Sequence, residues 1–344
     1  MILAFIILYI FALFATKFRD TNQRAFLIVI CLVLAFMAGL RDVETWNDTG
    51  NYVMAFDYNT PTLFHYNGNM KGVPYVEKGF YLLSVAIKTL TNDSQAYLVL
   101  VSLVTFFFLF KDFSQYATYP LLGVCIYISR FFVGRNLMQI RAGLAYAIIL
   151  LGIRYVTERN WKMYFLIIFI AYLFHQSALI AIPLYFMGYI KIKKKHVVML
   201  IAFAFILTAF FTPVLQQYVT DNASDLEVSN YVTGVEVEKA KGLRNPLIYF
   251  QCLWLFLFTF GERKIKKYLY DYYTIRNAYL LSTFILITFS MFLGLSGRTS
   301  TCFATLEFVI IPSIMFLFSK QFRFVFYFGL GAMLTGILYM NLHS

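Results

Sequence analysis

Charged residues are scarce in this chain. Asp, Glu, Lys and Arg make up 13% of its 344 residues, whereas 60% are hydrophobic and 20% are aromatic. A water-soluble domain of this length is excluded, because it could not bury so much apolar surface. Apolar runs long enough to span a membrane, roughly 16 to 20 residues, recur along the chain. The composition therefore predicts an all-α polytopic membrane protein.

Cysteine is also rare, and the sequence lacks the glycine motifs of nucleotide-binding proteins. The four cysteines, Cys31, Cys125, Cys252 and Cys302, all lie in apolar segments, and no two have the spacing of metal ligands. We expect no disulfide, no metal site and no cofactor. The missing GxxxxGKS/T and GxGxxG patterns argue against an ATP-driven pump or a redox enzyme. The energy of any reaction must then come from the substrate or from a gradient.

The apolar runs predict about ten full spans and one hairpin in a single transmembrane domain over residues 1–344. Lys and Arg mark the cytoplasmic ends of spans, and this rule places two long loops, 41–94 and 214–246, outside. Two short connections, 134–141 and 295–301, are also expected outside. The candidate spans, good to a few residues, are 2–16, 25–40, 95–110, 117–133, 142–157, 197–213, 247–261, 277–294, 302–318 and 324–341.

Two shorter segments need separate treatment. The first apolar segment lacks a basic region before it and a small-residue cleavage site after it, so we expect a retained helix rather than a signal peptide. Residues 79–90 are too short to cross the membrane and contain Lys88. They are expected to form an interfacial or re-entrant helix on the outer face.

The net charge of +12 has a topological explanation. In the predicted topology the excess of Lys and Arg falls on the cytoplasmic segments, where it sets the orientation and contacts anionic membrane lipids. A nucleic-acid-binding function is therefore not expected.

The segment 163–189 is apolar throughout except for His175 near its centre. Basic residues flank both of its ends, which places both ends on the cytoplasmic side and predicts a hairpin of two short helices with His175 at the apex. An ionisable group at such depth indicates a functional site. A histidine that only hydrogen-bonds to a neighbouring helix is an equal alternative.

Arginine, not lysine, occupies the positions nearest the outer membrane edge. Guanidinium groups make permanently charged, bidentate contacts with phosphate that lysine does not reproduce. The set therefore fits a lipid-linked phosphate or pyrophosphate better than a soluble metabolite. The alternative is that each arginine contacts lipid headgroups or pairs with a nearby acid. The four residues are Arg41, Arg135, Arg141 and Arg298.

The candidates for acid–base chemistry are His175, Asp48, Glu77 and Glu307. Histidine titrates in the useful range and can accept a proton from a sugar hydroxyl. Glu307 lies within a predicted span, so it must be protonated or paired. The nearest basic residue in sequence is Arg298, and a purely structural pair is the favoured interpretation.

These residues resemble the Wzy/EpsG-type family of bacterial polysaccharide polymerases. The likeness covers most of the chain, and it depends on the order and placement of short motifs. Members often have a glycine before the aspartate of the first motif, where this chain has Asn47. The matching motifs are Gly39-Leu-Arg41, Asp48-Thr-Gly-Asn-Tyr52, Glu77-Lys-Gly-Phe80, Gln139-Ile-Arg141-Ala142-Gly143-Leu-Ala145 and Ala171-Tyr-Leu-Phe-His175-Gln-Ser-Ala178.

The resemblance implies a GT-C-like glycosyltransferase of the bacterial cytoplasmic membrane. Such an enzyme transfers a growing glycan from undecaprenyl pyrophosphate to an incoming lipid-linked repeat unit at the outer face. It needs no metal, ATP or nucleotide sugar. A chain-length-regulating co-polymerase is a candidate partner.

The resemblance also suggests roles for individual residues. Arg41, Arg141 and Arg298, with Arg135, would bind the pyrophosphate. His175, or failing it Asp48 or Glu77, would remove the proton of the acceptor hydroxyl. Direct displacement would invert the anomeric carbon. The remaining candidates for substrate contact are Tyr52, Gln139 and Gln176.

Other classes of function remain open at this point. A flippase or transporter of lipid-linked oligosaccharides predicts charged residues along a path through both leaflets. A membrane O-acyltransferase acting on glycans predicts a catalytic histidine near the inner face. A ligase that transfers finished glycan differs from a polymerase in its acceptor, not in its donor chemistry.

Overall fold

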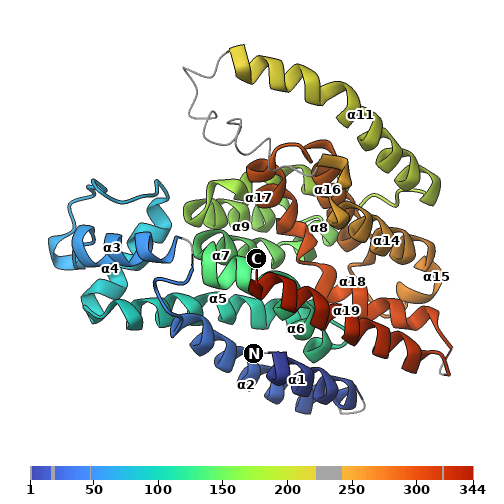
Figure 1. Ribbon diagram of the computed structural model, residues 1–344, viewed down its shortest axis with the longest axis horizontal. Helices are drawn as coiled ribbons and strands as arrows, with labels where there is room; N and C mark the ends of the chain where they lie inside the picture. The colour runs from blue at the N-terminus through green and yellow to red at the C-terminus, as the bar shows by residue number, and fades with distance from the viewer. Residues whose placement is uncertain (1, 17–19, 47, 222–241, 320, 344) are drawn as a thin grey trace. The chain divides into compact units, whose positions relative to one another are not determined.

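The computed structural model describes residues 2–16, 20–46, 48–221, 242–319 and 321–343, and these residues form helices and no strand (Figure 1). The predicted all-α class is confirmed. Among the described helices, four are long and apolar enough to cross a membrane: Ser94–Tyr116, Pro120–Met138, Ile140–Thr157 and Arg323–His343. The total of about ten spans stays a prediction.

The chain folds into two compact units, and its organisation as one transmembrane domain stays a prediction. Unit 1 comprises residues 1–155, 161–181 and 307–344, and unit 2 comprises residues 156–160 and 182–306. The elements of unit 1 are α1 (Ile2–Ala15), α2 (Asp20–Gly39), α3 (Thr49–Asn59), η1 (Leu63–His65), α4 (Lys78–Leu90), α5 (Ser94–Tyr116), α6 (Pro120–Tyr127), η2 (Ile128–Met138), α7 (Ile140–Leu150), α9 (Trp161–Phe174), η3 (Gln176–Ala181), α18 (Glu307–Ser313), η5 (Ile314–Leu317) and α19 (Arg323–His343). Helix α8 (Ile153–Thr157) contains residues of both units. The elements of unit 2 are α10 (Ile182–Met187), α11 (Lys194–Asp221), η4 (Gly242–Arg244), α14 (Pro246–Phe260), α15 (Glu262–Ile265), α16 (Tyr272–Thr288) and α17 (Leu293–Ala304).

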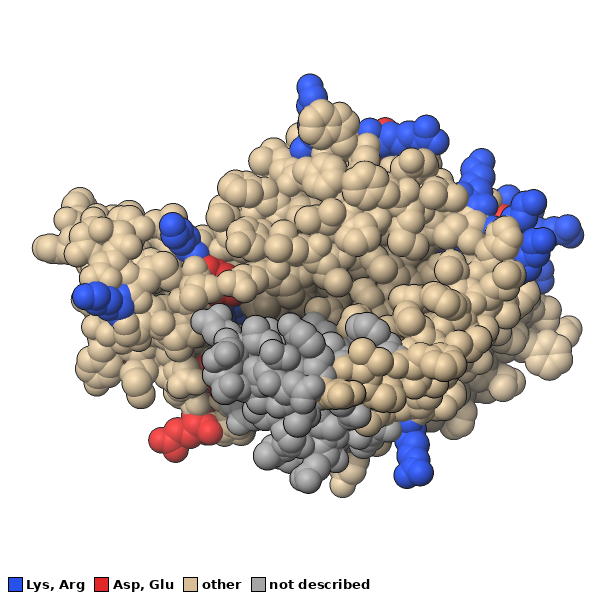
Figure 2. Space-filling view, turned by 90° about the horizontal axis from the view of Figure 1, so that it is seen from above, with Lys and Arg blue, Asp and Glu red and all other residues tan. Residues whose placement is uncertain are grey.

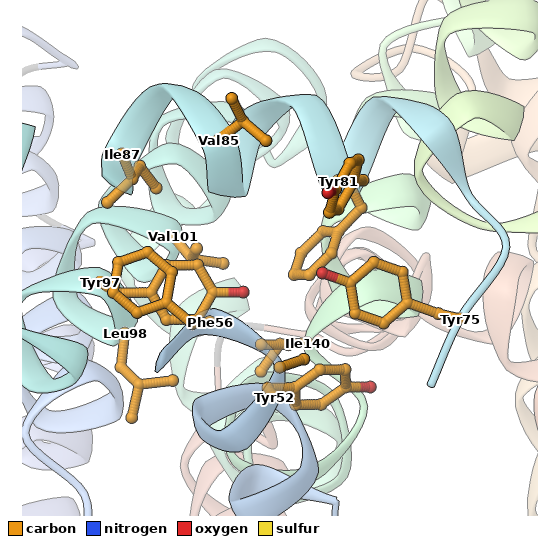
Figure 3. Packing of buried hydrophobic residues seen from close by; sticks show 12 residues of the cluster. Tyr52, Phe56, Tyr75, Tyr81, Val85, Ile87, Tyr97, Leu98, Val101 and Ile140 are labelled. Carbon is orange, nitrogen blue, oxygen red and sulfur yellow. The ribbon is translucent and has the colours of Figure 1, made fainter. Parts of the chain in front are cut away.

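An aromatic core in unit 1 joins α3, α4, α5 and α7 (Figure 3). The Phe56 ring stacks on the Tyr97 ring with 4.1 Å between centroids. Tyr75, in the loop before α4, meets Phe80 edge to face at 5.3 Å. Such pairs stabilise a fold by about 0.5–1.5 kcal/mol each beyond the burial of their surface. The predicted outer loop 41–94 is thus a packed helical cap on the end of α5, and the helix expected at 79–90 is α4.

The connection before α7 differs from the prediction. Residues 134–138 were expected in a loop, but they belong to η2, a π-helix that continues α6 to Met138. The chain bends at Gln139, whose φ is −96° and ψ is 60°, and α7 then begins. A loop was expected because Gly134, Arg135 and Asn136 interrupt the apolar run. In the folded protein the side chains of Arg135 and Asn136 form hydrogen bonds with Gln139 and Tyr127. π-Helical segments are rare and occur frequently at functional sites.

Gly143 allows α7 to approach this π-helix. A Cβ atom at Gly143 would lie 2.5 Å from the carbonyl oxygen of Arg135. We expect Gly143→Ala to reduce the free energy of unfolding by about 1–3 kcal/mol, because the backbone must move to admit the methyl group. Thermal unfolding in detergent measures the effect. Gly134→Ala is the matched control, since a Cβ there would meet nothing within 4 Å. Equal melting temperatures for the two variants would show that the approach is not tight.

Helices α9 and η3 form the turn that carries His175. Tyr164 Oη donates a hydrogen bond to the carbonyl oxygen of Ala181 at 2.7 Å, so the two arms lie side by side. His175 occupies the break between them. This geometry agrees with the predicted hairpin apex, while its depth in the membrane stays a prediction.

In unit 2, two buried polar residues of α16 hold the segment 187–192. Asn277 Nδ2 donates to the carbonyl oxygens of Met187, Gly188 and Ile190 at 2.8, 3.0 and 2.8 Å. Arg276, which is fully buried, donates to the carbonyl oxygen of Ile192 at 2.9 Å. These bonds satisfy backbone acceptors that have no helical partner.

Two of the expected outer segments in unit 2 are helical instead. Residues 295–301 were predicted to be a loop but belong to α17, and residues 214–221 continue α11. The rest of the predicted loop 214–246, from 222 to 241, lies outside the described residues. The backbone of Arg298 is in α17, and its side chain also lies outside the described structure.

The surface is predominantly uncharged, with Lys and Arg side chains visible mainly toward its edges (Figure 2). Large apolar side chains are exposed on the long helices, for example Phe107 at 53% and Phe328 at 73%. Such exposure is unfavourable in water but natural against lipid. Together with the long apolar helices, it identifies a membrane protein.

Candidate functional site

Arg41 is a buried cation at the end of α2, and only 5% of its surface is exposed. Its Nε donates to Thr49 Oγ1 at 3.2 Å and its Nη1 donates to the carbonyl oxygen of Ala38 at 2.6 Å. Its Nη2 is buried and has no hydrogen-bond partner among the described residues. Burial lowers the pKa of Arg41 to about 10, so the side chain still carries its charge at neutral pH.

Arg135 is a second buried cation, also 5% exposed, on the π-helix. Its Nη1 donates to Gln139 Oε1 at 3.0 Å, and its Cζ lies 4.4 Å from the centroid of the Tyr146 ring. Within the described part of the chain, neither Arg135 nor Arg41 forms an ion pair with a carboxylate. Buried charges in proteins are ordinarily paired.

Thr49 connects Arg41 to the π-helix that carries Arg135. Thr49 Oγ1, which accepts the hydrogen bond from Arg41, donates to the carbonyl oxygen of Leu137 at 3.1 Å. Leu137 is two residues beyond Arg135 in the same π-helix. Arg41 and the π-helix that carries Arg135 therefore meet at Thr49, and two buried cations without a carboxylate partner among the described residues would favour an anion.

Arg141 brings together three residues that the sequence selected separately. Its Nη1 forms an ion pair with Glu77 and its Nε donates to Tyr52 Oη at 3.3 Å. Its Cζ lies 4.9 Å from the ring centroid of Tyr75. Burial raises the pKa of both phenols, that of Tyr75 to about 12, so both remain neutral at neutral pH. This group offers one permanent charge and two aromatic faces.

His175 contacts the hydroxyl group of Ser177, which in turn contacts that of Tyr146. Ser177 Oγ lies 2.6 Å from His175 Nδ1, and Tyr146 Oη lies 2.6 Å from the same Ser177 oxygen. Since the Tyr146 ring lies against Arg135, the histidine is connected to one of the buried cations. Nothing in the sequence separated Tyr146 from the other tyrosines, because it lies in an apolar run without a motif of its own.

The start of α4 approaches the turn of His175 closely. A Cβ atom at Gly79 would lie 2.6 Å from Cβ of Leu173, two residues before His175. Glu77, two residues before Gly79, is thereby held near the same turn. The lack of a side chain at Gly79 permits this approach.

Three predicted site residues are not shown in this cluster. Asp48 is exposed and has a φ of 66°; it precedes α3 without capping it through its side chain. Gln176 is exposed at the start of η3. Arg298 belongs to unit 2, and its side chain is not described.

Glu307 has a partner that sequence proximity did not suggest. Arg130 Nε lies 2.8 Å from Glu307 Oε2, and Arg130 Nη2 lies 3.3 Å from Oε1. Glu307 is fully buried, and the pair is bidentate. The pair with Arg130 on the π-helix fits a structural role, and a contact of Glu307 with Arg298 stays a prediction, because the Arg298 side chain lies outside the described structure.

The described residues contain no group of three or more His, Cys, Asp or Glu side chains that could hold a metal ion. That the site works without a metal stays a prediction. The polar groups present are guanidinium, imidazole, hydroxyl and amide, with one carboxylate, that of Glu77, which is paired with Arg141; this set suits phosphate and sugar ligands better than a cation.

Comparison with known proteins agrees with these observations. The chain is 22% identical to the amylovoran biosynthesis protein AmsC of Erwinia amylovora over 306 residues, which are 84% of this chain and 78% of that protein. No solved structure matches the chain significantly. The model of the EpsG family matches residues 24–344, a range that contains every residue of the cluster just described. The chain therefore belongs to the EpsG family, whose members are polysaccharide polymerases of the membrane.

Proposed function

We propose that this protein polymerises oligosaccharide repeat units carried on undecaprenyl pyrophosphate, at the outer face of the bacterial cytoplasmic membrane. The observation that supports this function is the pair of buried arginines, Arg41 and Arg135, without a carboxylate partner among the described residues. A lipid pyrophosphate would supply the missing negative charge.

The donor pyrophosphate occupies the space around these arginines in this proposal. Arg41 Nη2 would donate to a phosphate oxygen, because that group is buried and has no other acceptor among the described residues. Fixed donors stabilise the charge that develops on the pyrophosphate when the glycosidic bond breaks. Arg135 adds a second charge, and the pyrophosphate-binding role of Arg298 stays a prediction from the sequence.

The reaction is a single displacement. The acceptor hydroxyl oxygen forms a bond to the anomeric carbon, and the bond from that carbon to the pyrophosphate oxygen breaks. The electron pair leaves with undecaprenyl pyrophosphate, and attack from the opposite side inverts the anomeric carbon. Arg141 with Tyr52 and Tyr75 would hold a sugar ring or the second phosphate, because these residues combine a charge with aromatic faces. Gln139 and Gln176 would contact the substrate, and a co-polymerase would regulate chain length.

Reconstitution tests this function. We expect purified protein in vesicles to convert a defined undecaprenyl-pyrophosphate-linked repeat unit into a ladder of products whose steps equal one repeat unit. The ladder should form without ATP and in the presence of a chelator. Movement of the intact lipid-linked unit across the membrane without joining would indicate a flippase instead. Addition of acyl groups to the glycan would indicate an acyltransferase.

A further inference from the structure

We propose that Tyr146 and Ser177 fix His175 as a neutral imidazole with its proton on Nε2. His175 then acts as a hydrogen-bond donor to the departing pyrophosphate and not as the base. The role of His175 in the reaction rests on the proposed function, whereas the position of the proton on Nε2 does not depend on it. It names Tyr146 and Ser177 as positioning residues.

The backbone amide of Ser177 determines the direction of the hydrogen bonds. Its N–H donates to His175 Nδ1 at 3.2 Å. A ring nitrogen that accepts a hydrogen bond carries no proton, so the proton of the neutral ring is on Nε2. The Ser177 hydroxyl, 2.6 Å from the same Nδ1, must then donate as well.

The Tyr146 hydroxyl continues the same direction. Since the Ser177 hydrogen points to the imidazole, the Ser177 oxygen accepts from Tyr146 Oη at 2.6 Å. The Arg135 guanidinium against the Tyr146 ring draws electron density from the phenol and makes it a stronger donor. The Ser177 hydroxyl thus donates to the imidazole and accepts from Tyr146.

A base function of His175 would conflict with this arrangement. To accept a proton from an acceptor sugar, Nε2 must first be unprotonated, and a neutral ring would then carry its proton on Nδ1. If Nε2 already carries a proton, only Nδ1 can accept one, and the ring becomes an imidazolium. In either case an N–H at Nδ1 would face the N–H of Ser177, and two hydroxyls would have to reverse. The Nε2–H group is instead suited to donate to an oxygen that becomes negative as the pyrophosphate leaves.

The acceptor proton then passes to a carboxylate. Glu77 is already paired with Arg141, whereas Asp48 is exposed and its side chain caps no helix. Asp48 also lies near enough to influence the Tyr52 phenol electrostatically. Asp48 therefore takes the proton in this account, and the electron pair of the broken bond stays on the pyrophosphate.

Amide substitutions distinguish a donor from a base. The side-chain amide of glutamine reaches the position of Nε2, and that of asparagine reaches the position of Nδ1, and neither is a base. We expect His175→Gln to keep polymerase activity within about tenfold of the wild type, while His175→Asn and His175→Ala lose about 100- to 1000-fold. Equal loss in all three variants would overturn the donor role. Normal activity of His175→Ala would instead remove His175 from the site altogether. His65→Gln, at an exposed histidine whose Nδ1 also contacts a hydroxyl, is the matched control.

Nitrogen NMR of the histidines tests the proton position without any activity. In protein labelled with nitrogen-15 histidine, we expect the His175 signals, assigned by their loss in His175→Ala, to show an unprotonated Nδ1 and a protonated Nε2. Ser177→Ala and Tyr146→Phe should shift these signals and reduce activity about tenfold, and Ser177→Thr should restore both, because threonine keeps the hydroxyl. A protonated Nδ1 in the wild type would overturn the inference even if the protein polymerises glycans.

Discussion

Arg41→Met is expected to abolish polymerisation while leaving thermal stability within about 1 kcal/mol of the wild type. The Arg41 side chain is buried, with one nitrogen unpartnered and no carboxylate beside it in the described structure. Removing the guanidinium raises the stability, because a charge no longer has to be buried, and lowers it, because two hydrogen bonds are lost; the two effects oppose each other. The pyrophosphate would lose a fixed donor, which lowers the rate by at least about 100-fold.

Two further variants make this result interpretable. Arg41→Lys keeps the charge but not the fork of donors, so its activity should fall between those of Arg41→Met and the wild type. Arg263→Met removes an exposed arginine of α15 and should change neither property. The measurements are the initial rate of ladder formation and the melting temperature. A melting temperature of Arg41→Met that falls together with activity would mean that Arg41 is a structural residue.

Arg130→Met should have the opposite profile, with a large loss of stability. It leaves the Glu307 carboxylate fully buried without its bidentate partner, and breaking such a pair costs about 3–5 kcal/mol. The expected result is a lower unfolding midpoint and less folded protein in the membrane.

The double variant Arg130→Met with Glu307→Leu separates structure from catalysis. It removes both charges together, so we expect it to recover most of the stability and to polymerise normally. A stable but inactive double variant would show that the pair takes part in the reaction.

The helices could be predicted because hydropathy is a local property. Helix α5 was expected at 95–110 and spans Ser94–Tyr116, and α19 was expected at 324–341 and spans Arg323–His343. The position of the turn at His175 followed from charges on both sides of one apolar segment. In each of these cases the signal lies within a few residues of the feature.

The failures have a different physical origin. Residues 134–138 and 295–301 were expected to be loops because glycine and polar residues usually end apolar helices, yet here they continue helices. Arg130, the partner that the structure shows for Glu307, lies 177 residues away in the chain, so sequence proximity did not suggest it. Tyr146 was missed because a role defined by contacts with Ser177 and Arg135 leaves no local pattern. For Glu307 and Tyr146, contacts between distant segments decided the outcome.

Binding of a lipid pyrophosphate tests most directly whether the buried arginines form the donor site. The measurement is the affinity of undecaprenyl pyrophosphate, without sugars, for purified protein in nanodiscs, comparing the wild type with the double variant Arg41→Met with Arg135→Met. We predict that the wild type binds and is thermally stabilised, and that the folded double variant binds at least about 100-fold more weakly. Equal affinity of the two proteins would contradict the account.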